Sequence, residues 1–345
     1  MRILSLFDGK SCGRIALERA GVSVTKYFSS EVDKFSMIVS KYNYPNVIQL
    51  GDVVRLRKLL QMDLVALNGL AANELVNHII DIKKNGIDVL IGGSPCQGFS
   101  FAGKHLNFED ERSALFFEFV KIRDIIKPRY FFLENVRMKK EIELEINRIM
   151  GVKPYKLNSN LVSAQNRLRY YWTNIKIKSL PVDAGIVLED ILQPIHEVGE
   201  KYFLKDKAAV CLTATEQMNW TETFIELGVK QSIYQYPRGK NIGGFFYGKT
   251  PTLTSCSWEF NNVLRTKGVF RRLTPIECER LQTVPDNYTA AVSDSQRYKM
   301  LGNGWTIDII AFFFKHINSK KTNNGQSKKR LKTAENYKNQ ISFRF

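Results

Sequence analysis

Short apolar runs alternate with amphipathic stretches along the first half of the chain. The runs cover residues 3–7, 88–91 and 130–133, and their length is that of buried β-strands. Residues 14–20 begin one amphipathic stretch, and residues 112–126 carry apolar positions at helical spacing. Strands that alternate with helices in this way predict an α/β fold with a doubly wound, mostly parallel sheet.

Polar residues follow each of the three apolar runs directly. Asp8-Gly9 follows the first run, the segment Gly92 to Cys96 follows the second, and Glu134-Asn135 follows the third. In a doubly wound sheet, ligands bind beyond the carboxyl ends of the strands. We therefore expect these three segments to lie at one edge of the sheet and to contribute chemistry to one crevice.

The remaining segments depart from this simple alternation. Residues 59–86 predict a helical insertion that ends in a glycine cap. Residues 175–268 are richer in Gly, Thr, Asn and aromatic residues, which predicts a separate, smaller, irregular β-rich domain. Residues 274–283 predict a helix with a Thr cap and Pro at its first position. Residues 296–316 predict a loop and then a very apolar helix packed on the sheet, and residues 318–345 a disordered tail.

The net charge of +17 favours a polyanionic partner. Residues 318–345 carry eight Lys and Arg against one acid, which is weak evidence because a basic tail can serve only to solubilise. Residues 127–178 carry twelve Lys and Arg against four acids. This excess lies in a segment expected to fold, and it points to nucleic acid.

The composition gives no indication of a membrane or a metal partner. No stretch of 18 apolar residues is present, and the apolar N-terminal run is too short for a signal peptide. The five cysteines form no Cys-x-x-Cys pair or Cys/His cluster, and the four histidines are scattered. We therefore expect a cytoplasmic protein with no membrane association and no metal site.

The segment Gly92-Gly93-Ser94-Pro95-Cys96-Gln97 places a cysteine on a tight turn at a strand end. The glycines permit close approach of the backbone, and the proline restricts the turn. A partly exposed cysteine there can be held as a thiolate by local dipoles or cations, which makes Cys96 a candidate nucleophile. The alternative is a small buried residue, the usual role of a lone cysteine.

Two further segments carry charged residues beside apolar strands. Glu134 emerges directly from the run YFFL, where its carboxyl group can protonate or hydrogen-bond a ring nitrogen; the alternative is an ion pair with an arginine. Gln165, Arg167 and Arg169 stand at alternate positions before the aromatic run YYW, so we expect them on one face of a strand. Two guanidinium groups on one face suit phosphates, a carboxylate or a carbonyl oxygen, and the alternative is a solvated charged face.

The turn Phe7-Asp8-Gly9-Lys10-Ser11-Cys12-Gly13 joins a predicted strand to a predicted helix. Turns of this kind bind nucleotide-like cofactors at the helix N-terminus. Glu31 follows a second predicted strand about 20 residues later, where an acid commonly binds ribose hydroxyls. Gly51-Asp52 closes a third such strand. These strand ends together predict a cofactor site.

These motifs resemble those of the C5-cytosine methyltransferase family, in the family's order and over nearly the whole chain. The segment Gly92 to Ser100 resembles the nucleophile loop, residues 134–136 the Glu-Asn-Val motif, and residues 165–169 the Gln-x-Arg-x-Arg motif. Residues 271–285 and 296–307 resemble the late motifs, with Asn303 in the family's Gly-Asn position. The sequences of Phe7-Asp8-Gly9 and of Gly92 to Cys96 are similar to those of phage and bacterial members and of the mammalian de novo enzymes.

The resemblance implies a Rossmann-like fold and transfer of a methyl group from S-adenosylmethionine to C5 of cytosine in double-stranded DNA. Cys96 would add to C6 of a base flipped out of the stack, and the product would be 5-methylcytosine. Glu134 would engage N3 and the amino group, and Arg169, with Arg167, would hold the ring carbonyl. The implied cofactor residues are Phe7, Gly9, Cys12, Glu31, Asp52, Pro95 and Asn303. The implied DNA contacts are Gln97, Ser100, Gln165 and Thr252.

The resemblance also divides the chain into parts. Residues 1–174 would form the catalytic and cofactor-binding domain, residues 175–268 the target-recognition domain, and residues 269–317 a return to the catalytic domain, followed by the basic tail. Residues 175–268 carry 11 Lys and Arg against 10 acids, so phosphate contacts elsewhere would supply affinity. We expect a monomer in a prokaryotic cell or encoded by a phage, associated with the nucleoid, which acts in restriction protection, phage self-modification or regulation.

Four residues depart from the family's pattern. Lys10 stands where an apolar residue is usual, Met300 and Gly304 where Gln and Ser are usual, and Thr283 where glycine is frequent. Lys10 lies beside the cofactor turn. It would point outward, meet the cofactor's carboxylate or weaken cofactor binding.

Two alternative functions follow from the same motifs. The first is a transfer-RNA cytosine-C5 methyltransferase, since that branch shares the motifs but carries Cys-Phe-Thr in the recognition region, where the nearest string here is Cys211-Leu212-Thr213. The second is a non-catalytic DNA-binding homologue, which Lys10 suggests and the presence of Cys96, Glu134 and Arg169 argues against.

Overall fold

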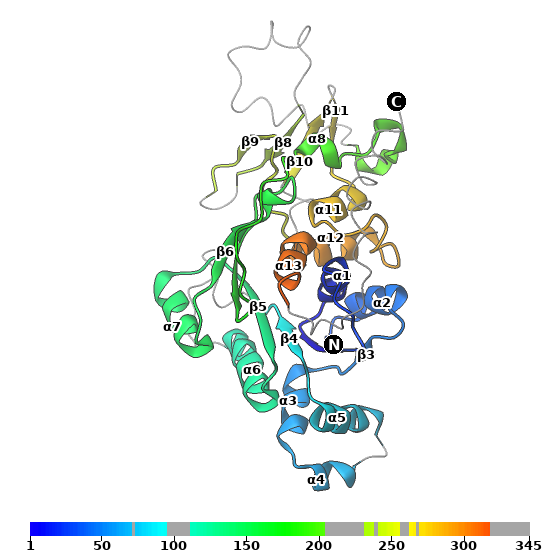
Figure 1. Cartoon of the computed structure of the whole chain (residues 1–345). Coiled ribbons are helices and arrows are strands. Elements are labelled where there is room, and N and C mark those ends of the chain that lie inside the picture. Colours follow the sequence, from blue (N-terminus) through cyan, green and yellow to red (C-terminus); the bar gives the residue numbers. More distant parts are fainter. Residues whose placement is uncertain are drawn as a thin grey trace, which may run out of the picture.

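A seven-stranded sheet in the order β3-β2-β1-β4-β5-β7-β6 forms the centre of the molecule (Figure 1). The computed structural model describes residues 1–70, 73–94, 111–203, 231–237, 241–255, 262–266 and 269–317. The strands of this sheet are β1 (Arg2–Leu6), β2 (Lys26–Ser30), β3 (Ile48–Gln49), β4 (Val89–Gly92), β5 (Tyr130–Val136), β6 (Tyr155–Asn158) and β7 (Leu168–Thr173).

The sheet is parallel except at β7, which runs antiparallel to both of its neighbours. This confirms the predicted doubly wound, mostly parallel α/β sheet, and β1, β4 and β5 match the three apolar runs. The chain moves outward from β1 to β2 and β3 and then returns to β4 on the other side of β1. The boundary between β1 and β4 is therefore the point where ligands bind in such sheets.

Alternate residues of the strands enter two separate cores, as the period of two requires. Ile3 and Phe132 point into one core, while Leu4 and Leu133 point into the other. Helices cover both faces, with α1, α2 and α13 on the first and α3, α5 and α6 on the second (Figure 1). The helices are α1 (Cys12–Arg19), α2 (Lys34–Asn43), α3 (Val53–Gln61), α4 (Leu64–Asn68), α5 (Glu74–Asn85), α6 (Glu111–Ile126), α7 (Lys140–Met150), α8 (Leu188–Ile191), α11 (Pro275–Leu281), α12 (Asp294–Asn303) and α13 (Ile307–Phe314).

Two predicted helix boundaries are confirmed in detail. The helical insertion ends at Gly86, whose φ of 69° suits glycine, and its N–H donates to the carbonyl of Ile82. Helix α11 begins at Pro275 after Thr274, whose side chain accepts from the N–H of Glu277 while the Glu277 carboxylate accepts from the N–H of Thr274. This reciprocal capping box satisfies two backbone donors that the helix itself leaves free.

The loop predicted at the start of 296–316 is wrong, because residues 294–303 form helix α12. Gly302 lies in its last turn, where glycine usually indicates a helix end. A Cβ at Gly302 would lie 2.2 Å from the carbonyl carbon of Thr254. The glycine is therefore required by the close approach of another backbone segment. The predicted apolar helix follows as α13, and it packs on α1 and on the sheet.

A second, antiparallel sheet in the order β11-β10-β8-β9 lies beside the first, at the top of Figure 1. Its strands are β8 (Ser232–Gln235), β9 (Gly244–Tyr247), β10 (Asn262–Thr266) and β11 (Val269–Arg271). Ile233 and Leu264 connect this sheet to the core that α1 and α13 share. Within the described ranges, no helix is long and apolar enough to cross a membrane.

Candidate active site

The ends of β4 and β5 lie side by side and are tied together by side chains. Nδ2 of Asn135 donates to Oγ of Ser94 at 3.1 Å. A Cβ at Gly93 would lie 3.2 Å from Oε2 of Glu134 and 2.7 Å from Nε1 of Trp305, so only glycine fits there. The predicted convergence of these two strand ends is confirmed. Four predicted site residues of the loop that follows, Pro95, Cys96, Gln97 and Ser100, lie outside the described residues, as does Cys211-Leu212-Thr213.

Glu134 and Arg169 form a half-buried ion pair on neighbouring strands. Oε1 of Glu134 lies 3.1 Å from Nε of Arg169, and the two side chains are 11 % and 13 % exposed. The Nε–H group of Arg169 does not point at the Glu134 carboxylate, because Nε has no hydrogen-bond acceptor. Glu134 therefore forms the ion pair with an arginine that the sequence offered as the alternative to a catalytic role. The arginine in that pair, Arg169, is itself a predicted site residue.

Gln165, Arg167 and Arg169 do not share one strand face as predicted, because β7 begins only at Leu168. Gln165 and Arg167 instead reach Leu253, where Oε1 of Gln165 accepts from the N–H and Nη1 of Arg167 donates to the carbonyl at 2.9 Å. Nη2 of Arg167 donates to the carbonyl of Gly304. With 3 % exposure, Arg167 is not part of a solvated charged face.

Residues 249–253 run along residues 164–167 and bring the second sheet against the arginine motif. The N–H of Thr250 donates to the carbonyl of Ala164, and the N–H of Asn166 donates to the carbonyl of Thr250. Oγ1 of Thr252 donates to the carbonyl of Asn166. The hydroxyl of Thr252, predicted to contact DNA, is thus engaged within the protein.

The turn after β1 combines three left-handed residues within five positions. Phe7, Gly9 and Ser11 have φ values of 55°, 58° and 62°. Such a conformation is uncommon for residues other than glycine and is often found at ligand sites. The turn is held from within by Asp8, whose carboxylate accepts from the hydroxyls of Ser5, Ser11 and Tyr27.

Asp8 therefore does not offer its carboxylate to the crevice, which corrects the prediction for this strand end. The side chain is 7 % exposed. Burial raises the pKa of Asp8 above its ordinary value, and the hydroxyl donors offset part of that effect. Cys12, the first residue of α1, is also buried.

The acids at the ends of β2 and β3 lie beside this turn. Oε2 of Glu31 accepts from the N–H of Gly9 at 2.7 Å, and Oε1 accepts from the N–H groups of Val32 and Asp33. A carboxylate offers about four acceptor positions, so one is left for a ligand hydroxyl. Asp52 is exposed and caps α3 through the N–H of Arg55. Asn303 is exposed at the end of α12.

Sequence reasoning missed Trp305 and Lys249. Trp305 packs edge-on against Phe132 and lies against Gly93, and its position next to Asn303-Gly304 was the available signal. Nζ of Lys249 donates to the carbonyls of Asn160, Ser163 and Ile186, which no local pattern indicates. Among the described residues, no group of His, Cys, Asp and Glu side chains is placed to hold a metal ion.

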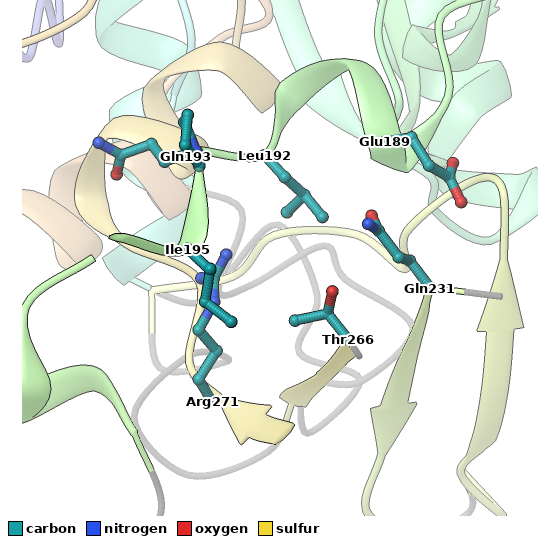
Figure 2. Close-up of a pocket in the computed structure, with 8 residues that line it drawn as sticks. Glu189, Leu192, Gln193, Ile195, Gln231, Thr266 and Arg271 are labelled. Atoms are coloured by element: carbon teal, nitrogen blue, oxygen red, sulfur yellow. The ribbon is translucent and has the colours of Figure 1, made fainter. Parts of the chain in front are cut away.

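A pocket of about 250 Å³ lies between α8 with the segment after it and the second sheet, and none of its lining residues is a predicted site residue (Figure 2). Arg271 lines it and is held by Glu277 through two hydrogen bonds of 2.8 and 2.7 Å. The pocket wall at Gln193 is joined to the same glutamate, because the N–H of Gln193 donates to Oε1 of Glu277. These contacts indicate a structural connection between α8 and α11.

A doubly wound sheet with an acid and an arginine paired on neighbouring strands at its ligand-binding edge suits an enzyme of the α/β class. A family model described as C-5 cytosine-specific DNA methylase matches residues 1–319. The chain therefore belongs to the C-5 cytosine-specific DNA methylase family, whose members transfer a methyl group to C5 of cytosine in DNA. The resemblance inferred from the motifs is confirmed.

Individual relatives agree with this assignment over most of their lengths. The chain is 27 % identical to the type II methyltransferase M.HhaI of Haemophilus parahaemolyticus, over 92 % of this chain and 94 % of that protein. It is 23 % identical to the orphan methyltransferase M.SPRI of Bacillus phage SPR, over 92 % and 97 %.

Solved structures at lower identity show the same fold. A Spodoptera frugiperda DNMT2 mutant matches with a TM-score of 0.61 and 19 % identity, over 91 % of this chain and 98 % of that one. A putative DNA modification methyltransferase encoded in an Escherichia coli prophage matches with a TM-score of 0.59 and 17 % identity, over 92 % and 98 %.

Proposed function

We propose that this methyltransferase attacks C6 of a flipped-out cytosine in double-stranded DNA with Cys96 and takes its methyl group from S-adenosylmethionine. The observation that carries the proposal is the joining of Ser94 to Asn135 beside Glu134. Cys96 follows Ser94 by two residues, so their Cα atoms are at most about 7 Å apart. This short connection would allow the nucleophile to reach the ring whose polar edge the carboxyl group binds.

Glu134 and Arg169 are suited to the polar edge of cytosine. The Glu134 carboxyl group would hydrogen-bond N3 and the amino group, which favours attack at C6 and makes C5 nucleophilic. Nε of Arg169 is a buried donor without an acceptor, and a donor of this kind is stabilised by a ring carbonyl. Arg167 is a positioning residue here, because its guanidinium holds Leu253 and Gly304.

The turn after β1 fits an adenosine-containing cofactor. A Cβ at Gly9 would meet no atom within 4 Å, so the backbone is open on that side. Glu31 would accept from the ribose hydroxyls, and the exposed Asp52 would accept from the adenine amino group. Phe7, Cys12, Pro95 and Asn303 complete the proposed site. The cofactor, when bound, supplies the methyl group.

Residues 175–268 are proposed as the target-recognition domain. Support comes from the second sheet and from residues 249–253, in which Leu253 is hydrogen-bonded to Gln165 and Arg167. Gln97 and Ser100 would contact the flipped base, and a closing loop would extend from Gln97 to about Asp110. Gln165 and Thr252 would act from within the protein, because Gln165 is buried and the Thr252 hydroxyl donates to the carbonyl of Asn166. The relatives suggest a role in restriction protection or as an orphan enzyme of a phage.

The substrate is tested by incubating the protein with tritiated S-adenosylmethionine and either duplex DNA or transfer RNA. We expect label in DNA as 5-methylcytosine and none in RNA. Label only in RNA would establish the transfer-RNA alternative, and label in neither would establish a non-catalytic homologue. Bisulfite sequencing of DNA from cells that express the protein then gives the target sequence.

A further inference from the structure

Lys10 is buried in an unusual way at the proposed cofactor turn. Its side chain is 1 % exposed, although lysine is almost never fully buried unless it is paired. Nζ of Lys10 donates to the carbonyl of Met300 at 3.0 Å. Both residues depart from the family's pattern, and the structure brings them into contact across 290 positions of the chain.

The carbonyl of Met300 belongs to the last turn of α12, where four carbonyls lack partners within the helix. The C-terminal end of a helix carries a partial negative charge, which a cation stabilises. The Lys10 ammonium group thus caps α12 from the turn after β1. Nε2 of Gln282 donates to the next carbonyl, that of Leu301, at 2.8 Å.

Gly304 leaves room for the end of the Lys10 side chain because glycine has no Cβ atom. A Cβ at Gly304 would lie 2.1 Å from Nζ of Lys10 and 2.9 Å from the carbonyl oxygen of Met300. The φ of Gly304 is −76°, which every residue adopts easily, so the backbone does not require glycine. The requirement for glycine comes from the end of the Lys10 side chain and from the Met300 carbonyl oxygen to which it donates. The two departures from the family, at positions 10 and 304, compensate each other.

We propose that Lys10 and Gly304 form an interlocking pair that fixes Asn303 against the cofactor turn. Lys10 is then a positioning residue of the cofactor site and does not bind the cofactor's carboxylate. Asn303 is the last residue of α12, in the turn that Lys10 caps, and it directly precedes Gly304. The carbonyl of Gly304 accepts from Arg167. The inference rests on the proposed cofactor site and names a residue pair that adjusts it.

The test uses the full chain with three variants, Gly304→Ser, Lys10→Met and the double variant. Thermal unfolding and the affinity for S-adenosylhomocysteine, measured by calorimetry, are the two readouts. We expect Gly304→Ser to unfold at a lower temperature and to bind at least tenfold more weakly. The double variant should regain part of both, because the methionine removes the ammonium group that the serine would meet, whereas the Met300 carbonyl oxygen still lies close to the new side chain.

Three outcomes would overturn the proposal. The first is a Gly304→Ser variant that behaves like the wild type, and the second is a double variant no better than Gly304→Ser. The third is a Lys10→Met variant that loses affinity for S-adenosylhomocysteine but not for 5′-methylthioadenosine, which lacks the carboxylate. If the wild type binds neither compound, the cofactor proposal fails, and the unfolding measurements still test the pair.

Discussion

Replacing Lys249 with methionine tests how the second sheet is fastened to the arginine motif. Nζ of Lys249 lies among three backbone carbonyls, those of Asn160 at 2.9 Å, Ser163 at 3.2 Å and Ile186. The first two carbonyls belong to the loop that precedes Gln165 and Arg167. Methionine keeps the length and apolar stem of the side chain and removes only the three donors.

The loss can be estimated from these contacts. A hydrogen bond to a charged group contributes roughly 1.5–3 kcal/mol. Lys249 is only partly buried, so water can replace some of the bonds, and we expect a total loss of about 3 kcal/mol rather than the full sum. For a chain of this size, with an unfolding entropy of about 2.1 cal/mol/K per residue, that corresponds to a fall of about 4 °C in the unfolding temperature. The rate of methyl transfer should also fall, because the loop positions Arg167.

Calorimetric unfolding and single-turnover methylation measure the two effects. Lys176→Met is the matched control, since Lys176 is exposed, and it should unfold within about 1 °C of the wild type. A Lys249→Met variant that unfolds with the control would show that the carbonyl contacts contribute nothing. An unchanged turnover rate despite lower stability would refute the link to Arg167.

Three further substitutions probe the fold. Arg271→Met leaves the fully buried Glu277 without its charged partner and should cost about 3–5 kcal/mol in urea unfolding. Arg271→Met with Glu277→Gln should lose less, because glutamine removes the unpaired charge and keeps an oxygen that accepts from a backbone N–H; equal losses would contradict the ion-pair explanation. Thr283→Asn should raise the free energy of unfolding by about 0.5–1 kcal/mol, because asparagine tolerates the φ of 52° better than a β-branched residue does. Asparagine also keeps an acceptor for the N–H of Asp308. A lower unfolding temperature in the variant would refute this expectation. Asp8 has a raised pKa, so its contribution to stability is largest at low pH and is lost as the pH rises through the folded-state pKa. The deficit of Asp8→Asn in urea unfolding should therefore shrink from pH 4 to pH 7, and a growing deficit would show the opposite shift.

The sheet and its active edge could be predicted because both depend on local pattern. Apolar runs of strand length predicted β1, β4 and β5, and the position of Glu134 after one of them predicted its place at the edge. Helix α11 was predicted because its threonine cap and its first-position proline are adjacent in the sequence. These signals need no knowledge of what lies elsewhere in the chain.

Other features depend on contacts between distant segments and left no local signal. Gly302 leaves room for the backbone at Thr254, and Gly304 leaves room for Lys10 and the carbonyl that it binds, so neither glycine indicates a turn. The strand-face argument failed at Arg167 because residues 249–253 draw it away from β7. At Thr283 the backbone itself favours glycine. Its positive φ explains why the family often has glycine at this position.

In the proposed mechanism, Cys96 bonds covalently to a cytosine in DNA. The most direct measurement uses duplex DNA in which 5-fluorocytosine occupies the target position, incubated with S-adenosylmethionine and either the wild type or Cys96→Ser. Fluorine at C5 blocks the release of the enzyme, so the adduct survives denaturation and its peptide can be identified by mass spectrometry. We predict an adduct at Cys96 in the wild type and none in the variant. An adduct that persists in Cys96→Ser, or one at another residue of the wild type, would contradict the account.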